Sequence, residues 1–279
     1  MRSTRALRPL FLLSVLLLPL GRLQAQRYWH DEQGRDAIRV DLLIPFLKGD
    51  GNKFPTGAAL PSLSVRVAEG IRLEGDFPMV RAGYDFGGTT GSLTAFRVGN
   101  PYFGIRVGED DKPFSGYFGA RAPLASKPEN LIGERAIRAG VIAAFEQPET
   151  FAADYMTFAG GLEWRRKSSG NFLLGAKGGS SLLVTTDGNP LSRTDAFLDY
   201  GARAGYEGSG ALATVALTGR YNLTEKGGGF SGRSQHAATG LFELRRGGIR
   251  PRVSLRIPFD KEIRDESGAS LGLGVSFAR

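Results

Sequence analysis

Basic side chains recur at alternate positions in several segments of this sequence, and they are the residues whose type and spacing most suggest chemistry. Acidic side chains share their phase. If both sets point into a closed, wet interior, they either attract anions to a narrow passage or neutralise one another as ion pairs. Pairing is favoured, because an unpaired arginine in a narrow interior costs free energy. The basic set is Arg39, Arg66, Arg81, Arg106, Arg121, Arg165, Lys177, Arg203, Arg220, Arg245, Arg250, Arg252 and Arg256, and the acidic set is Asp41, Asp85, Glu163, Asp199 and Glu243.

The sequence offers few candidate residues for catalysis or metal binding. The chain has no cysteine and two histidines, His30 and His236. A nucleophile needs a base within hydrogen-bond reach, but His236 is followed by two alanines and His30 has no serine nearby. Residues 170–177 lack the Gly-Lys-Ser/Thr ending of a P-loop. The sequence therefore predicts no catalytic residue, no metal site, no cofactor and no enzymatic activity.

The N-terminal residues have the form of a secretory signal peptide. A basic start is followed by an apolar run over residues 10–20 and by small Ala25 at a suitable cleavage position. The run is short for a spanning helix, although an uncleaved inner-membrane anchor is the alternative. We expect a signal peptide at 1–25, a periplasmic segment at 26–35 and one folded unit at 36–279.

The signal peptide also accounts for much of the chain's basicity. It carries four arginines and no acid, which is half of the formal net charge of +8. The remaining basic residues are spread along the chain without a basic run. A nucleic-acid partner is therefore not expected.

Period-two alternation dominates the rest of the chain and is typical of strands with one apolar face. About twelve such segments, within a range of 10 to 14, predict an all-β fold that closes as an antiparallel barrel. The segments are 36–47, 60–68, 71–86, 91–108, 114–125, 154–167, 170–185, 194–207, 210–224, 232–246, 249–260 and 268–279.

The connections between these segments alternate in length. Short turns of residue types that tolerate positive φ occur at 69–70, 168–169, 208–209 and 247–248. Longer polar loops occur at 48–59, 126–153, 186–193, 225–231 and 261–267. This asymmetry is typical of outer-membrane barrels, which have their short turns on the periplasmic side.

A soluble β-sandwich or soluble barrel also alternates, so the two must be distinguished. The segments here are near the ~9–11 residues that cross a membrane at a tilt, whereas soluble strands average about 5–6. One face is aliphatic, and the other is rich in Gly, Ser, Thr and Arg, which cannot form a dry core. Aromatic residues cluster near segment ends, as in the girdles of membrane barrels: Phe46 and Phe259 at the loop side, and Trp164, Phe172, Tyr206 and Phe277 at the turn side.

Three local features interrupt the regular pattern. The alternation changes phase near Pro78 and near residues 99–101, which suggests β-bulges that bend the wall. The loop at 126–153 is rich in alanine, with apolar residues at three- and four-residue spacing, and predicts a short amphipathic helix. That helix either closes or enters the external mouth of the barrel, or only packs on its rim.

Residues 77–125 carry a family resemblance. The stretches Phe77 to Phe86, Val98-Gly99-Asn100-Pro101-Tyr102-Phe103-Gly104-Ile105 and Gly116 to Leu124 resemble outer-membrane transporters of the phenol meta-pathway type. The resemblance implies a passive channel for small, apolar or aromatic solutes. The last strand resembles the signal read by the barrel-assembly machinery, except that Ala278-Arg279 follow Phe277.

Two known classes of barrel enzyme do not match. Outer-membrane phospholipase places a histidine two residues before its serine, and omptin-type proteases place an aspartate two residues before a histidine. Around His236 the corresponding positions hold Ala238 and Ser234. Two functions remain open: an outer-membrane channel for small solutes, or a non-conducting structural or adhesion barrel whose external loops do the work. The partners expected are outer-membrane lipid and lipopolysaccharide.

Overall fold

A computed structural model describes residues 37–48, 56–85, 92–109, 111–186, 194–226, 230 and 232–278. The predicted signal peptide at 1–25 and the segment at 26–35 lie outside these ranges. Within them, no helix is both long and apolar enough to span a membrane.

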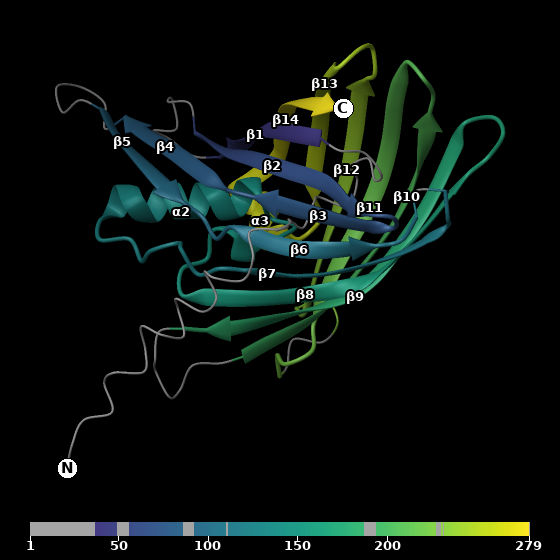
Figure 1. Cartoon of the computed structure of the whole chain (residues 1–279). Coiled ribbons are helices and arrows are strands. Elements are labelled where there is room, and N and C mark those ends of the chain that lie inside the picture. The colour runs from purple at the N-terminus through teal and green to yellow at the C-terminus, as the bar shows by residue number, and fades with distance from the viewer. Residues whose placement is uncertain are drawn as a thin grey trace.

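The strands form one closed antiparallel barrel (Figure 1). The barrel closes because β1 pairs with β14 on one side and with β2 on the other. The strands are β1 (Ala37–Leu47), β2 (Gly57–Ala68), β3 (Ile71–Asp76), β4 (Met79–Asp85), β5 (Ser92–Val98), β6 (Tyr102–Val107), β7 (Phe114–Arg121), β8 (Tyr155–Lys167), β9 (Phe172–Thr185), β10 (Thr194–Glu207), β11 (Ala211–Asn222), β12 (Ser234–Leu244), β13 (Ile249–Pro258) and β14 (Ser267–Ala278).

The wall has twelve strands because two of its members are interrupted. β3 and β4 follow one another along one member, and β5 and β6 along the next. Asp76 pairs with Tyr102 and Met79 with Val98, so residues 77–78 lie opposite residues 99–101. One extra residue therefore sits in the second member. This is the bulge predicted there, and the predicted barrel of about twelve strands is confirmed.

The outer surface is apolar, as the alternation predicts. Ile38 is 57% exposed and Leu255 is 43% exposed, whereas their neighbours Arg39 and Arg256 are buried. Exposed aromatic side chains lie near strand ends, with Phe46 toward the loops. The apolar face points outward, away from a polar interior, which suits a barrel surrounded by lipid.

Short turns lie at one end of the barrel. Gly70 and Gly247 have φ of 65° and 75°, which glycine adopts without a steric penalty. The connection between β6 and β7 begins at the same end, where the Gly108 amide donates to the Gly70 carbonyl at 2.7 Å. We call this end the turn side and the opposite end the loop side.

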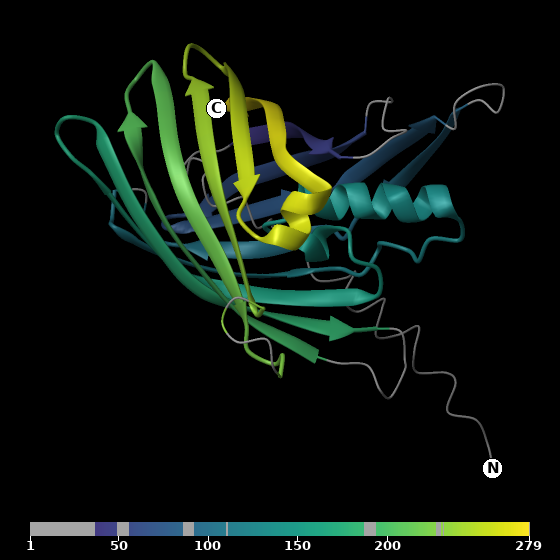
Figure 2. The ribbon, with the colours of Figure 1, turned by 180° about the vertical axis from the view of Figure 1, so that it is seen from behind.

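Helices occur at the loop side (Figure 2). α2 (Leu131–Ala143) starts after Asn130, whose side chain accepts a hydrogen bond from the Gly133 amide at 2.8 Å. It is followed by the 3-10 helix η2 (Pro148–Thr150). A short helix that the sequence did not predict, α3 (Lys261–Glu266), precedes β14.

We call the segment 122–153, which contains α2 and η2, the inserted segment. Its residues 126–131 are exposed at the mouth of the barrel, and the residues from Ala136 onward are mostly buried in the loop-side half. Ala136 and Ala143 of α2 are fully buried, and so, to within 1%, are Glu149 and Phe151. Of the two placements open from the sequence, the helix therefore enters the mouth of the barrel.

Candidate functional site

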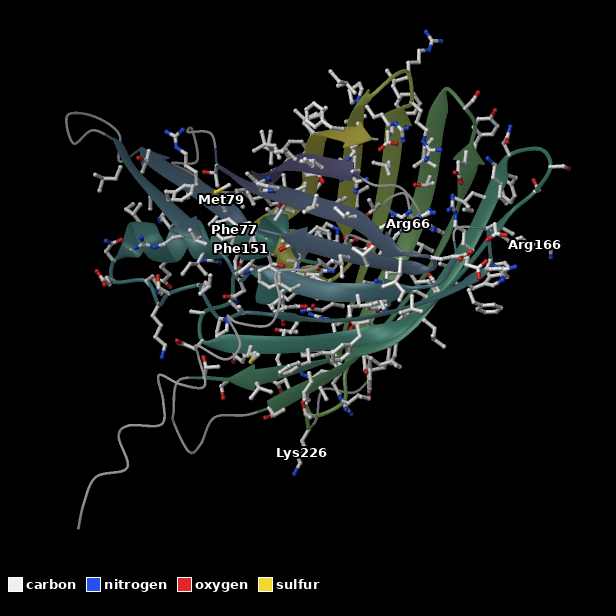
Figure 3. The ribbon with its side chains drawn as sticks, viewed as in Figure 1. Arg66, Phe77, Met79, Phe151, Arg166 and Lys226 are labelled. Atoms are coloured by element: carbon white, nitrogen blue, oxygen red, sulfur yellow. The ribbon has the colours of Figure 1, made fainter. Side chains whose placement is uncertain are left out.

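The interior of the barrel, its lumen, is the candidate site, and most of the predicted charged residues line it. Eight of the basic residues are buried in it: Arg39, Arg106, Arg121, Arg203, Arg220, Arg245, Arg252 and Arg256. Arg165, Lys177 and Arg250 are half-buried, and Arg66 is exposed at the turn side (Figure 3). Among the acids, Asp41, Glu163 and Glu243 are buried and Asp199 is half-buried. The side chain of Asp85 lies outside the described part of the chain.

Arg81 is placed differently from the prediction. It lies exposed on the outer face of β4, because its neighbours Val80 and Ala82 point inward and pack against α2. Asp76, Val80 and Ala82 share the inner face, so the backbone keeps its phase past Pro78. What changes past Pro78 is what the inner face contacts. Before it the inner face contacts charged side chains, and after it the inner face packs on the apolar side of α2. The bulge predicted near Pro78 on this strand is therefore wrong.

Arg106 joins three strands on the turn side. Its Nε donates to Glu74 at 3.1 Å, and its Nη1 donates to Glu163 at 2.8 Å. All three side chains are at most 8% exposed. Each carboxylate thus has a cation within bonding distance, which offsets part of the cost of removing both charges from water.

A second ion-pair group continues this layer on β10 and β12. Arg245 contacts Glu243 and Glu207, each at 3.3 Å, and Arg165 also donates to Glu207. Arg252 of β13 pairs with Asp41 of β1, with Nε donating to Oδ1 at 2.7 Å. The turn-side half of the lumen is therefore lined by buried ion pairs that join wall strands.

On the loop side the wall bonds to the inserted segment instead. Arg121 donates to Asp76 at 3.0 and 3.2 Å, to the carbonyl of Asn100 at 2.9 Å and to Oε1 of Gln147 at 2.7 Å. Its ring contact with Tyr102 has a guanidinium-to-centroid distance of 5.4 Å. Arg121 thus connects the interruption between β5 and β6, at Asn100, to Gln147 of the inserted segment.

Arg220 makes the matching contact on the far wall. It donates to both oxygens of Glu149 at 2.7 and 3.1 Å, and to Asp199 at 3.1 Å. Glu149 is 1% exposed, so this bidentate pair is removed from solvent. Beside it, Glu146 accepts hydrogen bonds from Thr218 and Thr239 at 3.1 and 3.0 Å.

Asn100 holds the two ends of the inserted segment together. Its Nδ2 donates to the carbonyls of Glu149 and Ala152 at 2.9 and 2.6 Å, and its Oδ1 accepts from the Ala125 amide at 2.7 Å. Beside it, a Cβ on Gly99 would lie 2.4 Å from the carbonyl oxygen of Thr150. The interruption between β5 and β6 is therefore shaped to receive this segment.

The opposite face of the segment packs on apolar side chains. Alanines of α2 and Phe151 form one buried cluster with residues of β1, β2 and β4: Leu43, Ala58, Leu60, Val80 and Ala82. β2 and β11 lie nearly opposite one another in the strand order. The segment thus crosses the lumen, with apolar contacts on one wall and polar contacts on the other.

A small crevice remains between the segment and the polar wall. Lys177, Asp199, Thr218 and His236 line it together with Glu146. It extends from the loop side to charged residues inside the barrel. His236 contacts Tyr200 at 2.7 Å between Nε2 and the hydroxyl oxygen. In the described ranges, no cluster of three or more histidine and acidic side chains is arranged to hold a metal.

Several interior residues were missed from the sequence. Arg72, Glu74 and Asp76 alternate along β3 and are visible as a period-two charged run. Glu207 ends β10 in phase with Arg203. No periodic signal marks the interior residues outside the strands: Asn100, Glu146, Gln147 and Glu149.

Comparisons with known proteins identify the fold. No protein-family model and no curated protein sequence matches the chain. Among solved structures, it is similar to an outer membrane channel from Pseudomonas putida F1, with a TM-score of 0.54 and 11% identity over 91% of this chain and 100% of that chain. It is also similar to the NanC porin, with a TM-score of 0.53 and 9% identity over 87% and 98% of the two chains. The chain has the fold of Gram-negative outer-membrane β-barrels.

The sequence-based prediction that the chain is not an enzyme is wrong as stated. Solved outer-membrane barrels include enzymes as well as channels, so the barrel fold gives that prediction no support. The missing motifs exclude two specific catalytic arrangements around His236. They do not exclude catalysis from a barrel of this kind.

Proposed function

We propose that this protein gives small solutes a narrow passage through the outer membrane, and that the inserted segment controls its loop-side entrance. The main observation that supports this proposal is that the segment crosses the lumen and makes different kinds of contact with the two opposite walls. Its apolar face packs on β1, β2 and β4, while hydrogen bonds and one ion pair join it to β11 and β12. A crevice already separates part of the segment from β11 and β12, so this is the side that opens.

The nature of the solute follows from two further observations. The resemblance of residues 77–125 to transporters of the phenol meta-pathway type supports a passive channel for small, apolar or aromatic molecules. The crevice carries both signs of charge, on Lys177 and Asp199, so it offers no ring of one sign that would select anions or cations.

A non-conducting barrel is the second candidate, and the turn-side ion pairs favour it. Arg106, Arg245 and Arg252 each join acids of other strands inside the barrel. If these contacts fill the cross-section permanently, the lumen is a packed interior. The external loops are then the working part.

Planar-bilayer conductance distinguishes the two candidates. Glu149→Gln weakens the bond to Arg220, so mean conductance should rise above that of the wild type. The control is Glu109→Gln, which lies exposed at the turn side and should leave conductance unchanged. A wild type and a Glu149→Gln variant that both assemble and both fail to conduct would reject the channel and leave the non-conducting candidate.

Location and processing belong to the same proposal. We infer export with removal of residues 1–25, assembly by the barrel-assembly machinery through β14, and contact with outer-membrane lipid and lipopolysaccharide. Fractionated cells should hold the protein in the outer membrane, with Gln26 as its first residue. Recovery from the soluble periplasm would contradict this proposal.

A further inference from the structure

A second cavity, separate from the crevice in the lumen, lies at the loop-side mouth between α2, α3 and the ends of β1 and β4. Its volume is about 450 Å³. Pockets for small molecules typically measure ~300–1,000 Å³, so this cavity has the size of a ligand site. Figure 2 shows α3 beside one end of α2. Both helices contribute residues to the lining of the cavity.

The floor of the cavity is apolar, and two of its side chains are alanines. Ala82, Ala139 and Ile142 line it and are each at most 7% exposed, and Leu47 completes it. The small residues leave the space that larger ones would fill. Water over such a floor is released favourably when an apolar group covers it.

The rim of the cavity is charged and carries both signs equally. Basic and acidic side chains come from α2, α3 and the end of β1: Lys48, Arg135 and Arg138, and Glu134, Asp265 and Glu266. A solute with one charge meets like charges as well as opposite ones. A solute with both charges finds a partner for each.

One ion pair crosses the rim and connects α2 with α3. Arg138 Nη2 lies 2.5 Å from Glu266 Oε1, and Arg138 Nε donates to Oε2 at 2.8 Å. The side chains are 64% and 36% exposed. An exposed pair contributes little to stability, so a ligand that offers each partner an equivalent charge replaces it at small cost.

We propose that this cavity binds a small zwitterionic solute with an apolar side chain, as in an apolar α-amino acid. The apolar part covers Ala82 and Ile142, the carboxylate accepts hydrogen bonds from Arg138, and the ammonium donates to Glu266. This inference concerns binding at the mouth, and it holds whether or not the lumen conducts.

Calorimetric titration of the purified full-length protein tests the charge requirement. The probes are L-phenylalanine, phenylacetate and phenethylamine, which share a ring but differ in charge. L-phenylalanine should bind at least tenfold more tightly than either analogue. With Arg138→Glu the rim pair becomes two acids, and phenethylamine should become the tightest probe. Adding Glu266→Arg reverses the original pair and should restore the preference for L-phenylalanine.

A filling variant tests the position of the site. Leu131→Trp enlarges a lining side chain that is 58% exposed, so the fold should tolerate it, and affinity for L-phenylalanine should fall at least tenfold. Leu124→Trp is the matched control, because Leu124 is 56% exposed and lies outside the cavity lining. Equal affinities in the two variants would overturn the proposal. So would an Arg138→Glu variant that still prefers L-phenylalanine, or the absence of saturable binding to the wild type.

Discussion

The two halves of the lumen are built from different kinds of contact. On the turn side, Arg106 and its acids all come from wall strands, whose register fixes their distances. On the loop side, Glu149 and Gln147 come from a segment whose position depends on a few polar bonds and one apolar cluster. The contacts that hold the wall together therefore lie mainly in the turn-side half. Under the proposed function, the loop-side half controls the entrance.

The largest effect is expected in the turn-side half. Arg106→Met keeps most of the side-chain volume but leaves Glu74 and Glu163 buried without their cation. Breaking a buried pair on one side costs about 3–5 kcal/mol, so the free energy of unfolding should fall by that amount. Urea titration in detergent, followed by heat-modifiable gel mobility, measures it.

Lys112→Ala is the control for this change. Its ion pair with Glu109 lies at the same end of the barrel, but the side chains are 58% and 48% exposed. An exposed pair contributes ~0–1 kcal/mol. Equal losses in the two variants would mean that burial does not set the strength of these pairs.

Asn100→Ala tests the loop-side half. It removes the partner of three backbone groups at the ends of the inserted segment, at about 1 kcal/mol each, so unfolding should become easier by about 3 kcal/mol. Trypsin should also cut more rapidly after Arg135 or Arg138, because α2 is released from the wall.

Asn222→Ala is the matched control. Its side chain accepts two backbone hydrogen bonds at 2.9 Å, from Thr224 and Glu225, within one local turn. This variant should leave α2 protected from trypsin. The same rate of cleavage in both variants would show that Asn100 does not hold the segment.

The difference between the halves also decides what the sequence could predict. Strand residues alternate, so the pairs Arg252–Asp41 and Arg245–Glu243 were within reach of a period-two pattern. Register brings Arg252 and Asp41 together once the barrel is assumed, and Arg245 and Glu243 are two residues apart along the chain. The charges of the turn-side half therefore follow in part from the sequence, although Glu74 and Glu207 were missed.

The contacts of the loop-side half could not be predicted from the sequence, for a physical reason. Where a strand packs on α2, its inner face is apolar, as Val80 and Ala82 show. The alternation then reads as inverted, and Arg81 was assigned to the wrong face. Glu149 lies outside the periodic segments, and Asn100 lies where the alternation of the segment 91–108 changes phase. The partners of both are set by tertiary packing, which no local pattern encodes.

Gly99→Ala tests how closely the inserted segment approaches the wall. The added methyl carbon would lie 2.4 Å from the carbonyl oxygen of Thr150 and 2.9 Å from the ring of Phe151, so backbone must move. We expect a loss of about 1–2 kcal/mol in the free energy of unfolding. Gly178→Ala is the control within a strand, since its Cβ would meet nothing within 4 Å. A loss in the control as large as in Gly99→Ala would contradict close approach as the cause.

The smallest change in stability is expected for Arg81→Ala. The alternation of charged residues places this arginine in the lumen, where truncation would leave an acid unpaired and cost several kcal/mol. The structure places it exposed on the outer face of β4, with α2 on the other side of that strand. Surface substitutions away from special features change stability by less than about 0.5 kcal/mol, so Arg81→Ala should unfold at nearly the wild-type urea concentration. Arg121→Ala, measured alongside, should unfold much earlier, because it removes the bonds to Asp76 and Gln147. A large loss of stability in Arg81→Ala would indicate that this arginine points into the lumen. It would also mean that α2 does not cover the inner face of β4.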